Sequence, residues 1–361
     1  MTLRYHAAYM HWAKARPAAS FDLGISNVLG CSIDDLPGAA EALSFAGRND
    51  NGYEPLLEAI ATRYGVDISQ VTTAQGASGA NFLVYAALLA PGDDVLVERP
   101  GYDPLLAAPR LLGANVTQFD RTFDDKYALD PGRVKAALTP KTRLIVVTTP
   151  HNPSGVIADA DALREIGRIA ETNDAHVLVD EVYLDSAGRD IRPAVHFGDR
   201  FIVTSSLTKS YGLAGLRSGW ILSSPEIAER IRRARDVVDG SGSIITERLS
   251  VVAFTHLDTL LARARAILTR NGPVVERFLE SRNELESVAP DGGTVVFPRL
   301  RDVPDTRTFA ERLLKERQTA VVPGHFFQAP SHIRMGFSGE TAALEAGLEQ
   351  VAAALDARAW R

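Results

Sequence analysis

A lysine in a glycine-punctuated segment is the residue of this 361-residue chain with the clearest capacity for covalent chemistry. Lys209 follows the apolar run 201–204 and a pair of serines, and Arg217 comes eight residues later. The run predicts a buried strand, so Lys209 should lie just past its carboxyl end, the edge of open α/β sheets where ligands bind. A lysine that loses its proton there through desolvation can attack a carbonyl as a neutral amine. Because most loop lysines are solvated surface charges, this interpretation needs support from other residues.

Two further loops carry chemistry that complements an amine. Asn152 lies in a loop after the apolar run 144–149, and Asp180 and Tyr183 follow the run 176–179. A carboxylate at a strand end can hold a protonated ring nitrogen, and an amide or a phenol can hydrogen-bond a phenolate oxygen. Each loop alone could be an ordinary turn or a solvated strand end. Their common position after strands, in the right order, makes the group informative.

A run of small residues at 75–80 precedes a helix that begins near Ser78. Backbone N–H groups at such a helix N-terminus can hold a phosphate. Arg217 can fork onto a phosphate or a carboxylate. The structural alternatives are a tight turn for the small residues and a surface ion pair for the arginine.

Alternating strands and helices must position these loops. Between residues 55 and 240 short apolar runs alternate with helical patterns such as 159–173, which indicates βαβ units and a mostly parallel sheet. Ser224 and Pro225 fit the N-cap and first position of a further helix. The expected strands are 95–98, 115–119, 144–148, 176–179 and 201–204.

The C-terminal third has a different pattern. A long helix is expected over 257–287, bent near Gly272-Pro273, and a last helix is expected from about residue 340. Short apolar runs and a helix at 306–317 lie between them, which predicts a smaller α+β module that begins near residue 245.

Composition excludes several classes of function. The net charge is −6, with 45% hydrophobic and 23% charged residues, and no basic stripe or basic amphipathic segment indicates nucleic acid or a membrane surface. The single cysteine, Cys31, excludes an internal disulfide and a cysteine-based metal cluster, and it fits a reducing cytoplasm. No apolar run approaches the length of a membrane span, and residues 1–6 lack an apolar signal core.

Read together, these motifs resemble the fold-type I pyridoxal-phosphate enzymes, in the class I/II aminotransferase group, from about Phe21 to Phe337. The resemblance rests on the motifs 206–209 with Arg217, 151–155 and 180–183. It implies an aspartate-aminotransferase-like α/β large domain, with a mostly parallel sheet flanked by helices, plus a smaller α+β domain. The implied division is an N-terminal segment 1–40 that packs with the small domain, a cofactor-binding domain 41–245 and a C-terminal domain 246–361.

The resemblance implies a role for each ring-side residue. Lys209 would form the internal Schiff base (aldimine) with the aldehyde of pyridoxal 5′-phosphate, and Asp180 would pair with the pyridinium nitrogen. Asn152 and Tyr183 would hydrogen-bond the ring oxygen O3′, and Tyr102 would stack on the ring face.

It also implies phosphate and substrate contacts. The phosphate would lie on the amides of Ala77 and Ser78, with help from Ser206 and Arg217. Arg334 would clamp the substrate α-carboxylate by a bidentate pair.

Ile25 and Ser26, in a segment similar to the family's substrate-side loop, are candidate substrate contacts beside Asn152. No metal ligand is expected.

The family builds its sites at the interface of a homodimer, so shared active sites are expected. A tyrosine from the neighbouring subunit commonly reaches the cofactor phosphate there. The corresponding stretch 45–52 has no tyrosine, and Arg48 or Asn49 could take its place.

These features predict a cytoplasmic aminotransferase acting on an amino acid and a 2-oxo acid. Two alternatives stay open: another pyridoxal-phosphate reaction on an amino acid (β-elimination, decarboxylation or oxidation), and a non-catalytic regulatory module on the same fold.

Overall fold

A seven-stranded sheet forms the centre of the chain in this computed structural model, which describes residues 6–188 and 191–360. Its strands lie in the order β2-β8-β7-β6-β5-β3-β4, and neighbouring strands from β7 to β4 are parallel. β8 runs antiparallel to both of its neighbours, β2 and β7. The mostly parallel α/β sheet expected from the sequence is confirmed. The strands are β2 (Val71–Gln75), β3 (Asp94–Arg99), β4 (Asn115–Asp120), β5 (Thr142–Thr148), β6 (His176–Asp180), β7 (Phe201–Ser206) and β8 (Ser218–Leu222).

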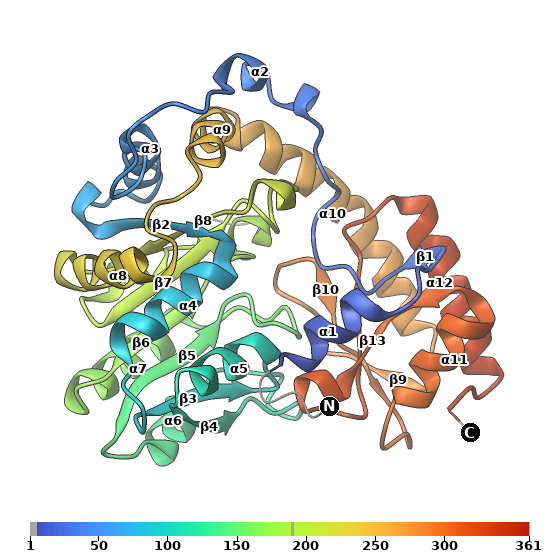
Figure 1. Cartoon of the computed structure of the whole chain (residues 1–361). Coiled ribbons are helices and arrows are strands. Elements are labelled where there is room, and N and C mark those ends of the chain that lie inside the picture. The colour runs from blue at the N-terminus through green and yellow to red at the C-terminus, as the bar shows by residue number, and fades with distance from the viewer. Residues whose placement is uncertain (1–5, 189–190, 361) are drawn as a thin grey trace.

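Helices cover both faces of this sheet (Figure 1). In β5, Leu144 and Val146 join the core on one face, and Ile145 and Val147 join the core on the other. Successive strand side chains point to opposite faces, so a strand buried on both sides reads as a continuous apolar run. One face packs against α4 (Gly76–Leu88), α5 (Asp103–Leu111) and α8 (Pro225–Val238). The other packs against α3 (Glu54–Tyr64), α6 (Pro131–Ala137), α7 (Ala160–Thr172) and α9 (Ile244–Thr255).

A second hydrophobic core lies on the C-terminal side of the chain, to the right in Figure 1. Helix α10 (Leu257–Glu280) connects the two cores, because Leu260 packs in the first and Val275 in the second. A three-stranded antiparallel sheet in the order β10-β14-β13 belongs to this part. The elements of this C-terminal part after α10 are β9 (Leu285–Glu286), β10 (Val295–Val296), β11 (Arg299–Leu300), α11 (Arg307–Arg317), β12 (Thr319–Ala320), β13 (Val322–Pro323), β14 (Ile333–Gly336) and α12 (Thr341–Asp356).

The N-terminal segment crosses between the two cores. After α1 (Ala8–Ala15), β1 (Phe21–Asp22) pairs in parallel with β12, and Leu23 packs in the second core. Leu36, which precedes α2 (Ala39–Ala42), and Ala39, the first residue of α2, pack in the first core. The domain limits given above remain a prediction. None of the described helices is long and apolar enough to cross a bilayer.

Two expectations about elements need correction. The long helix ends at Glu280 and not near residue 287, because the chain turns at Ser281 and enters β9. Strands β2 and β8 were not expected from the sequence, because β2 buries polar Thr72 and Thr73 and β8 begins with Ser218-Gly219. Position 219 requires glycine for a steric reason, because a Cβ there would lie 2.4 Å from the Gly76 carbonyl carbon.

Candidate active site

A cavity of about 350 Å³ lies at the carboxyl ends of β5, β6 and β7. All of the predicted site residues line it except Arg334, which is hydrogen-bonded to three of the lining residues. Ligands in α/β sheets bind outside these strand ends. The predicted residues in its wall are Ile25, Ser26, Ala77, Ser78, Tyr102, Asn152, Asp180, Tyr183, Ser206, Lys209 and Arg217.

Lys209 extends into this cavity from the turn after β7. Its Nζ donates to Asn27 Oδ1 at 2.6 Å and to Ser26 Oγ at 3.1 Å. Burial lowers the pKa of Lys209 to about 7; Arg334 acts in the same direction, and Asp180 opposes it. At neutral pH a large fraction of this amine is therefore uncharged and nucleophilic.

Asp180 ends β6 and is held from helix α4. Asn81 Nδ2 donates to Asp180 Oδ2 at 2.9 Å, and Thr204 Oγ1 donates to Asn81 Oδ1 at 2.6 Å. Burial raises the pKa of Asp180, although the bond from Asn81 opposes that shift. A buried carboxylate aimed into a cavity needs a cationic or protonated partner there.

The N-terminus of α4 and Arg217 form one end of the cavity. Gly76, the first residue of α4, has φ = 71°, and a Cβ there would lie 2.5 Å from Arg217 Nη2. Only glycine lets the guanidinium approach this backbone. The first N–H groups of a helix lack intrahelical acceptors, so Ala77 and Ser78 present free donors beside a cation. This is an anion-binding arrangement.

Arg334 lies on β14, buried to 99%. Its Nη1 donates to Asn152 Oδ1 at 3.1 Å, and its Nη2 donates to Tyr9 Oη at 2.7 Å and Gly24 O at 3.1 Å. Its Nε has no partner among the described residues. A buried guanidinium held only by neutral groups can receive a carboxylate.

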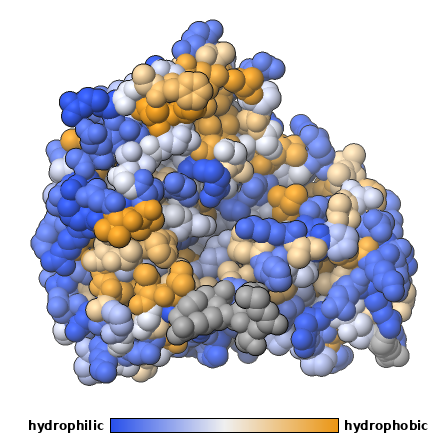
Figure 2. All heavy atoms as spheres, in the orientation of Figure 1, coloured by the Kyte–Doolittle hydropathy of each residue, from blue (hydrophilic) through white to orange (hydrophobic). Residues whose placement is uncertain are grey.

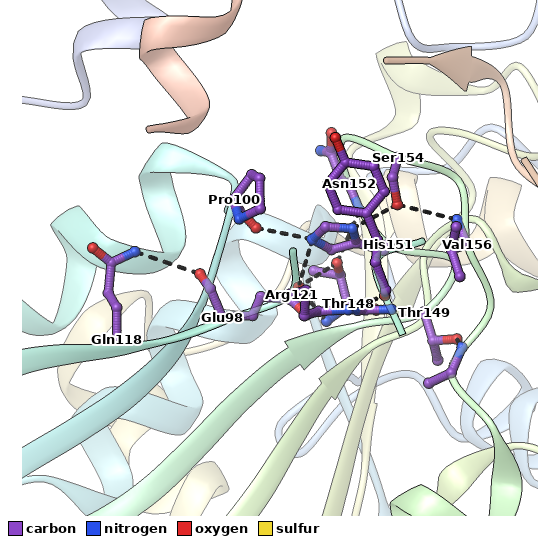
Figure 3. Close-up of polar contacts among 12 residues, drawn as sticks. Glu98, Pro100, Gln118, Arg121, Thr148, Thr149, His151, Asn152, Ser154 and Val156 are labelled. Carbon is purple, nitrogen blue, oxygen red and sulfur yellow. Dashed lines mark hydrogen bonds and ion pairs between the residues drawn. The ribbon is translucent and has the colours of Figure 1, made fainter. Parts of the chain in front are cut away.

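Asn152 is fixed by a buried network at the ends of β3 and β5 (Figure 3). Its backbone N–H donates to Thr148 Oγ1 at 2.9 Å, and Thr148 donates both its N–H and its hydroxyl to Glu98 Oε1. Arg121 Nη1 donates to Glu98 Oε2 at 2.8 Å, and both side chains are fully buried. Burial raises the pKa of Glu98, and the arginine opposes that shift.

His151 joins the loop of Asn152 to the loop of Tyr102. Its Nδ1 lies 2.7 Å from Ser154 Oγ, and its Nε2 lies 2.8 Å from Pro100 O (Figure 3). Burial, aided by Arg121, lowers its pKa well below the usual value, so the ring is neutral. The network therefore holds both loops at one side of the cavity without placing a charge in it.

Comparison with known proteins identifies the protein family to which this chain belongs. The family described as aminotransferase class I and II matches residues 27–351, and the chain belongs to this family. Capreomycidine synthase of Streptomyces vinaceus is 32% identical over 324 residues, which cover 88% of this chain and 83% of that protein.

Two solved structures share the fold along nearly the full length. A PLP-dependent aminotransferase from Streptococcus suis 89-1591 superposes with a TM-score of 0.92 at 25% identity, covering 99% of each chain. The PLP-dependent cyclase OrfR superposes with a TM-score of 0.88 at 26% identity, again covering 99% of each chain.

The cofactor of the chain is therefore pyridoxal 5′-phosphate, and the site fits it. The buried hydroxyl of Tyr183 has no partner among the described residues, although burial keeps it protonated by raising its pKa to about 12. Asp180 needs a protonated partner, and the α4 N-terminus with Arg217 needs an anion. A phenolic oxygen, a pyridinium nitrogen and a phosphate on one small ring meet these three requirements.

Sequence reasoning missed several residues that complete the site. Tyr9 accepts from Arg334, Asn27 accepts from Lys209, and Asn81 donates to Asp180. Arg16 lines the cavity and pairs with Asp22. The first two come from the N-terminal segment, far in sequence from their partners. Asn81 carried a local signal, because it directly follows the small residues that open α4, about one helical turn after Ala77.

Proposed function

We propose that this chain is an aminotransferase that moves an amino group between an amino acid and a 2-oxo acid. One observation carries the proposal: the buried amine of Lys209, whose pKa is lowered to about 7, lies in a cavity whose wall residue Asn152 is hydrogen-bonded to Arg334, the proposed anchor of the substrate carboxylate. When bound, pyridoxal phosphate supplies a carbonyl that condenses with amines and a ring that withdraws electrons from the substrate Cα.

The chain's own groups then divide the work. Arg334 and Asn152 bind the α-carboxylate and orient the substrate, with Ile25 and Ser26 at its side. Lys209 Nζ, as a neutral amine, takes the proton from Cα.

Eight residues besides Lys209 hold the cofactor in this proposal. Asp180 keeps the ring nitrogen protonated, and Tyr183 and Asn152 hold the ring oxygen. Tyr102 lies against the ring, and Arg217 lies at the phosphate. Ala77, Ser78 and Ser206 complete the phosphate site.

A half-reaction test decides the reaction type. The purified enzyme, loaded with cofactor, is mixed with single amino acids in the absence of any oxo acid. Transamination predicts loss of the visible cofactor band, with one 2-oxo acid released per site and no free ammonia. Full retention of the band with every amino acid, alongside an altered substrate, would contradict the proposal.

Another pyridoxal-phosphate reaction is the second candidate, and two of the similar proteins support keeping it. The similar proteins include a capreomycidine synthase and a PLP-dependent cyclase as well as aminotransferases. β-Elimination would release ammonia, decarboxylation would release carbon dioxide, and oxidation would consume oxygen, each with return of the original absorbance. Mass spectrometry of the product from the same half-reaction separates them.

A non-catalytic regulatory module is the third candidate. The site gives this candidate no support, because Lys209 and Asp180 line the cavity and Arg334 is hydrogen-bonded to Asn152 in its wall, as the catalytic proposal requires. A purified chain that gains no visible absorbance when cofactor is added would revive it.

We extend the proposal to a cytoplasmic homodimer with shared active sites. An apolar patch lies over α2 and α9 in Figure 2. Elsewhere, Phe45, after α2, and Val237, on α8, expose 91% and 88% of their surface. Large exposed apolar groups of this kind mark interaction surfaces. Light scattering would give the mass of a dimer, whereas a monomer at micromolar concentration would contradict it.

Arg48, not Asn49, is the residue available to the partner's cofactor phosphate. The Asn49 amide donates internally to Gly242 O and Glu247 Oε2, whereas Arg48 is exposed and, among the residues that the structure describes, pairs only with Asp50 at the surface. Loss of cofactor affinity in Arg48→Ala would support this assignment, and unchanged affinity would contradict it.

A further inference from the structure

Asn27 contacts the reacting nitrogen of the site without any role assigned to it above. Lys209 Nζ donates to its Oδ1 at 2.6 Å, the shorter of the two bonds that the amine makes. The residue is half-buried and lines the same cavity. An acceptor at this distance fixes where the amine lies.

The backbone that carries Asn27 is fastened on both sides. Its carbonyl accepts from Ser338 Oγ at 2.7 Å, and the next residue, Val28, donates its N–H to Lys209 O at 3.1 Å. Leu29 N–H then donates to Ser338 O at 3.3 Å. The segment is therefore tied both to the turn that carries the lysine and to the strand end after β14.

Close packing beside these bonds leaves the segment little room to shift. A Cβ on Gly336 would lie 1.8 Å from Ile25 O, and Ser26 O accepts from Thr294 Oγ1 at 2.7 Å. The amide oxygen of Asn27 is thus an acceptor on a fixed backbone, not the tip of a mobile loop.

The charged groups around the amine come from every wall of the cavity. Burial, Arg334 and Arg217 lower the pKa of Lys209, and Asp180 raises it. The Tyr183 ring centroid lies 5.9 Å from Nζ. Asn27 adds a strong acceptor at 2.6 Å but no charge. An aspartate in its place would put a second carboxylate against the nitrogen and favour the cation.

We propose that Asn27 is the positioning residue of the catalytic amine, and that its amide oxygen aims Lys209 Nζ into the cavity through an uncharged acceptor. The freed amine returns to this acceptor during turnover. The inference rests on the proposed use of Lys209 as the base, but it concerns the nitrogen and not which reaction follows.

The isosteric variant Asn27→Asp tests the charge. The visible band of the cofactor-loaded enzyme is titrated with pH, since it follows protonation of the Lys209 nitrogen. We expect the midpoint to rise by about 1 to 3 pH units, the effect of an opposite charge in contact. The matched control Asn283→Asp makes the same change at an exposed position in the turn after α10, and its midpoint stays at the wild-type value. A folded, loaded Asn27→Asp enzyme with an unshifted midpoint would overturn the proposal.

A second variant, Asn27→Leu, tests the anchor and stays informative if the aspartate does not fold. Leucine has a similar size and no acceptor. We expect kcat to fall about 10- to 100-fold while KM for the amino donor changes less than about threefold, as for a misplaced reacting group. Unchanged kcat with raised KM would show a merely structural role. The absorbance titration reads the nitrogen even if no amino acid is transaminated, so failure of the two proposals is distinguishable.

Discussion

The two walls of the cavity are built in different ways. The sheet wall consists of strand ends and the α4 N-terminus, where Asp180 ends β6 and Tyr183 and Lys209 follow β6 and β7 within a few residues. The opposite wall consists of Tyr9 and the segment 24–27, which reach Arg334 and Lys209 across more than 180 residues of chain. The sheet wall fits the cofactor, and the opposite wall holds the groups proposed to meet the substrate.

This difference separates two kinds of function. A group on the sheet wall acts on every substrate, because it works on the cofactor or the shared proton. Arg334 and the residues proposed to contact substrate on the opposite wall act through the particular molecule bound, whereas Asn27 on that wall acts through Lys209. Variants in the two walls should therefore differ in which kinetic constant they change.

Lys209→Ala should have the largest effect. Removal of the amine deletes both the cofactor's covalent attachment and the base, so kcat should fall at least about 10³-fold with every amino donor. Single-turnover absorbance measurements would show this, with circular dichroism as the control for folding. A loss of activity confined to some amino donors would contradict the assignment of Lys209 to the groups that act on every substrate.

Arg334→Lys should have a smaller and more selective effect. A lysine keeps the charge but not the fork, so kcat/KM for α-amino acids should fall about 10²-fold. An amine of the same side chain without the carboxylate should react with both enzymes equally slowly. Equal losses for the acid and the amine would show that Arg334 supports the cavity and does not read the carboxylate.

The sheet wall is also the part that could be predicted from local sequence. A short apolar run predicts a strand, and Asp180 or Lys209 directly after such a run must then lie at the carboxyl end of that strand, where ligands bind. Arg334 was predicted only through the family resemblance. Asn27 and Tyr9 could not be predicted, because their contacts exist only after residues from both ends of the chain pack together.

The pH dependence of turnover should report the lysine. With the pKa of Lys209 near 7, the amine is protonated at lower pH and cannot accept the Cα proton. The rate should therefore fall about tenfold for each pH unit below the midpoint and level off above it. Measurement of kcat from pH 5.5 to 9 checks this, and a flat acidic limb would show that another step limits turnover.

Glu181 gives the smallest effect, on stability and not on chemistry. It is buried beside Asp180 but accepts from Ala194 N–H at 2.7 Å on the far side, and its Oε2 has no partner among the described residues. Burial, with repulsion from Asp185 and Asp180, raises its pKa to about 8. The folded state thus holds a proton that the unfolded chain releases near pH 4.5, so the stability from this carboxyl is lost as pH rises through 8.

Glu181→Gln keeps the acceptor and cannot ionise. Its melting temperature should exceed the wild-type value by about 2–4 °C at pH 9, with little difference at pH 5. An equal shift at both pH values would mean that packing and not ionisation is responsible, and an altered kcat would assign Glu181 to the sheet wall.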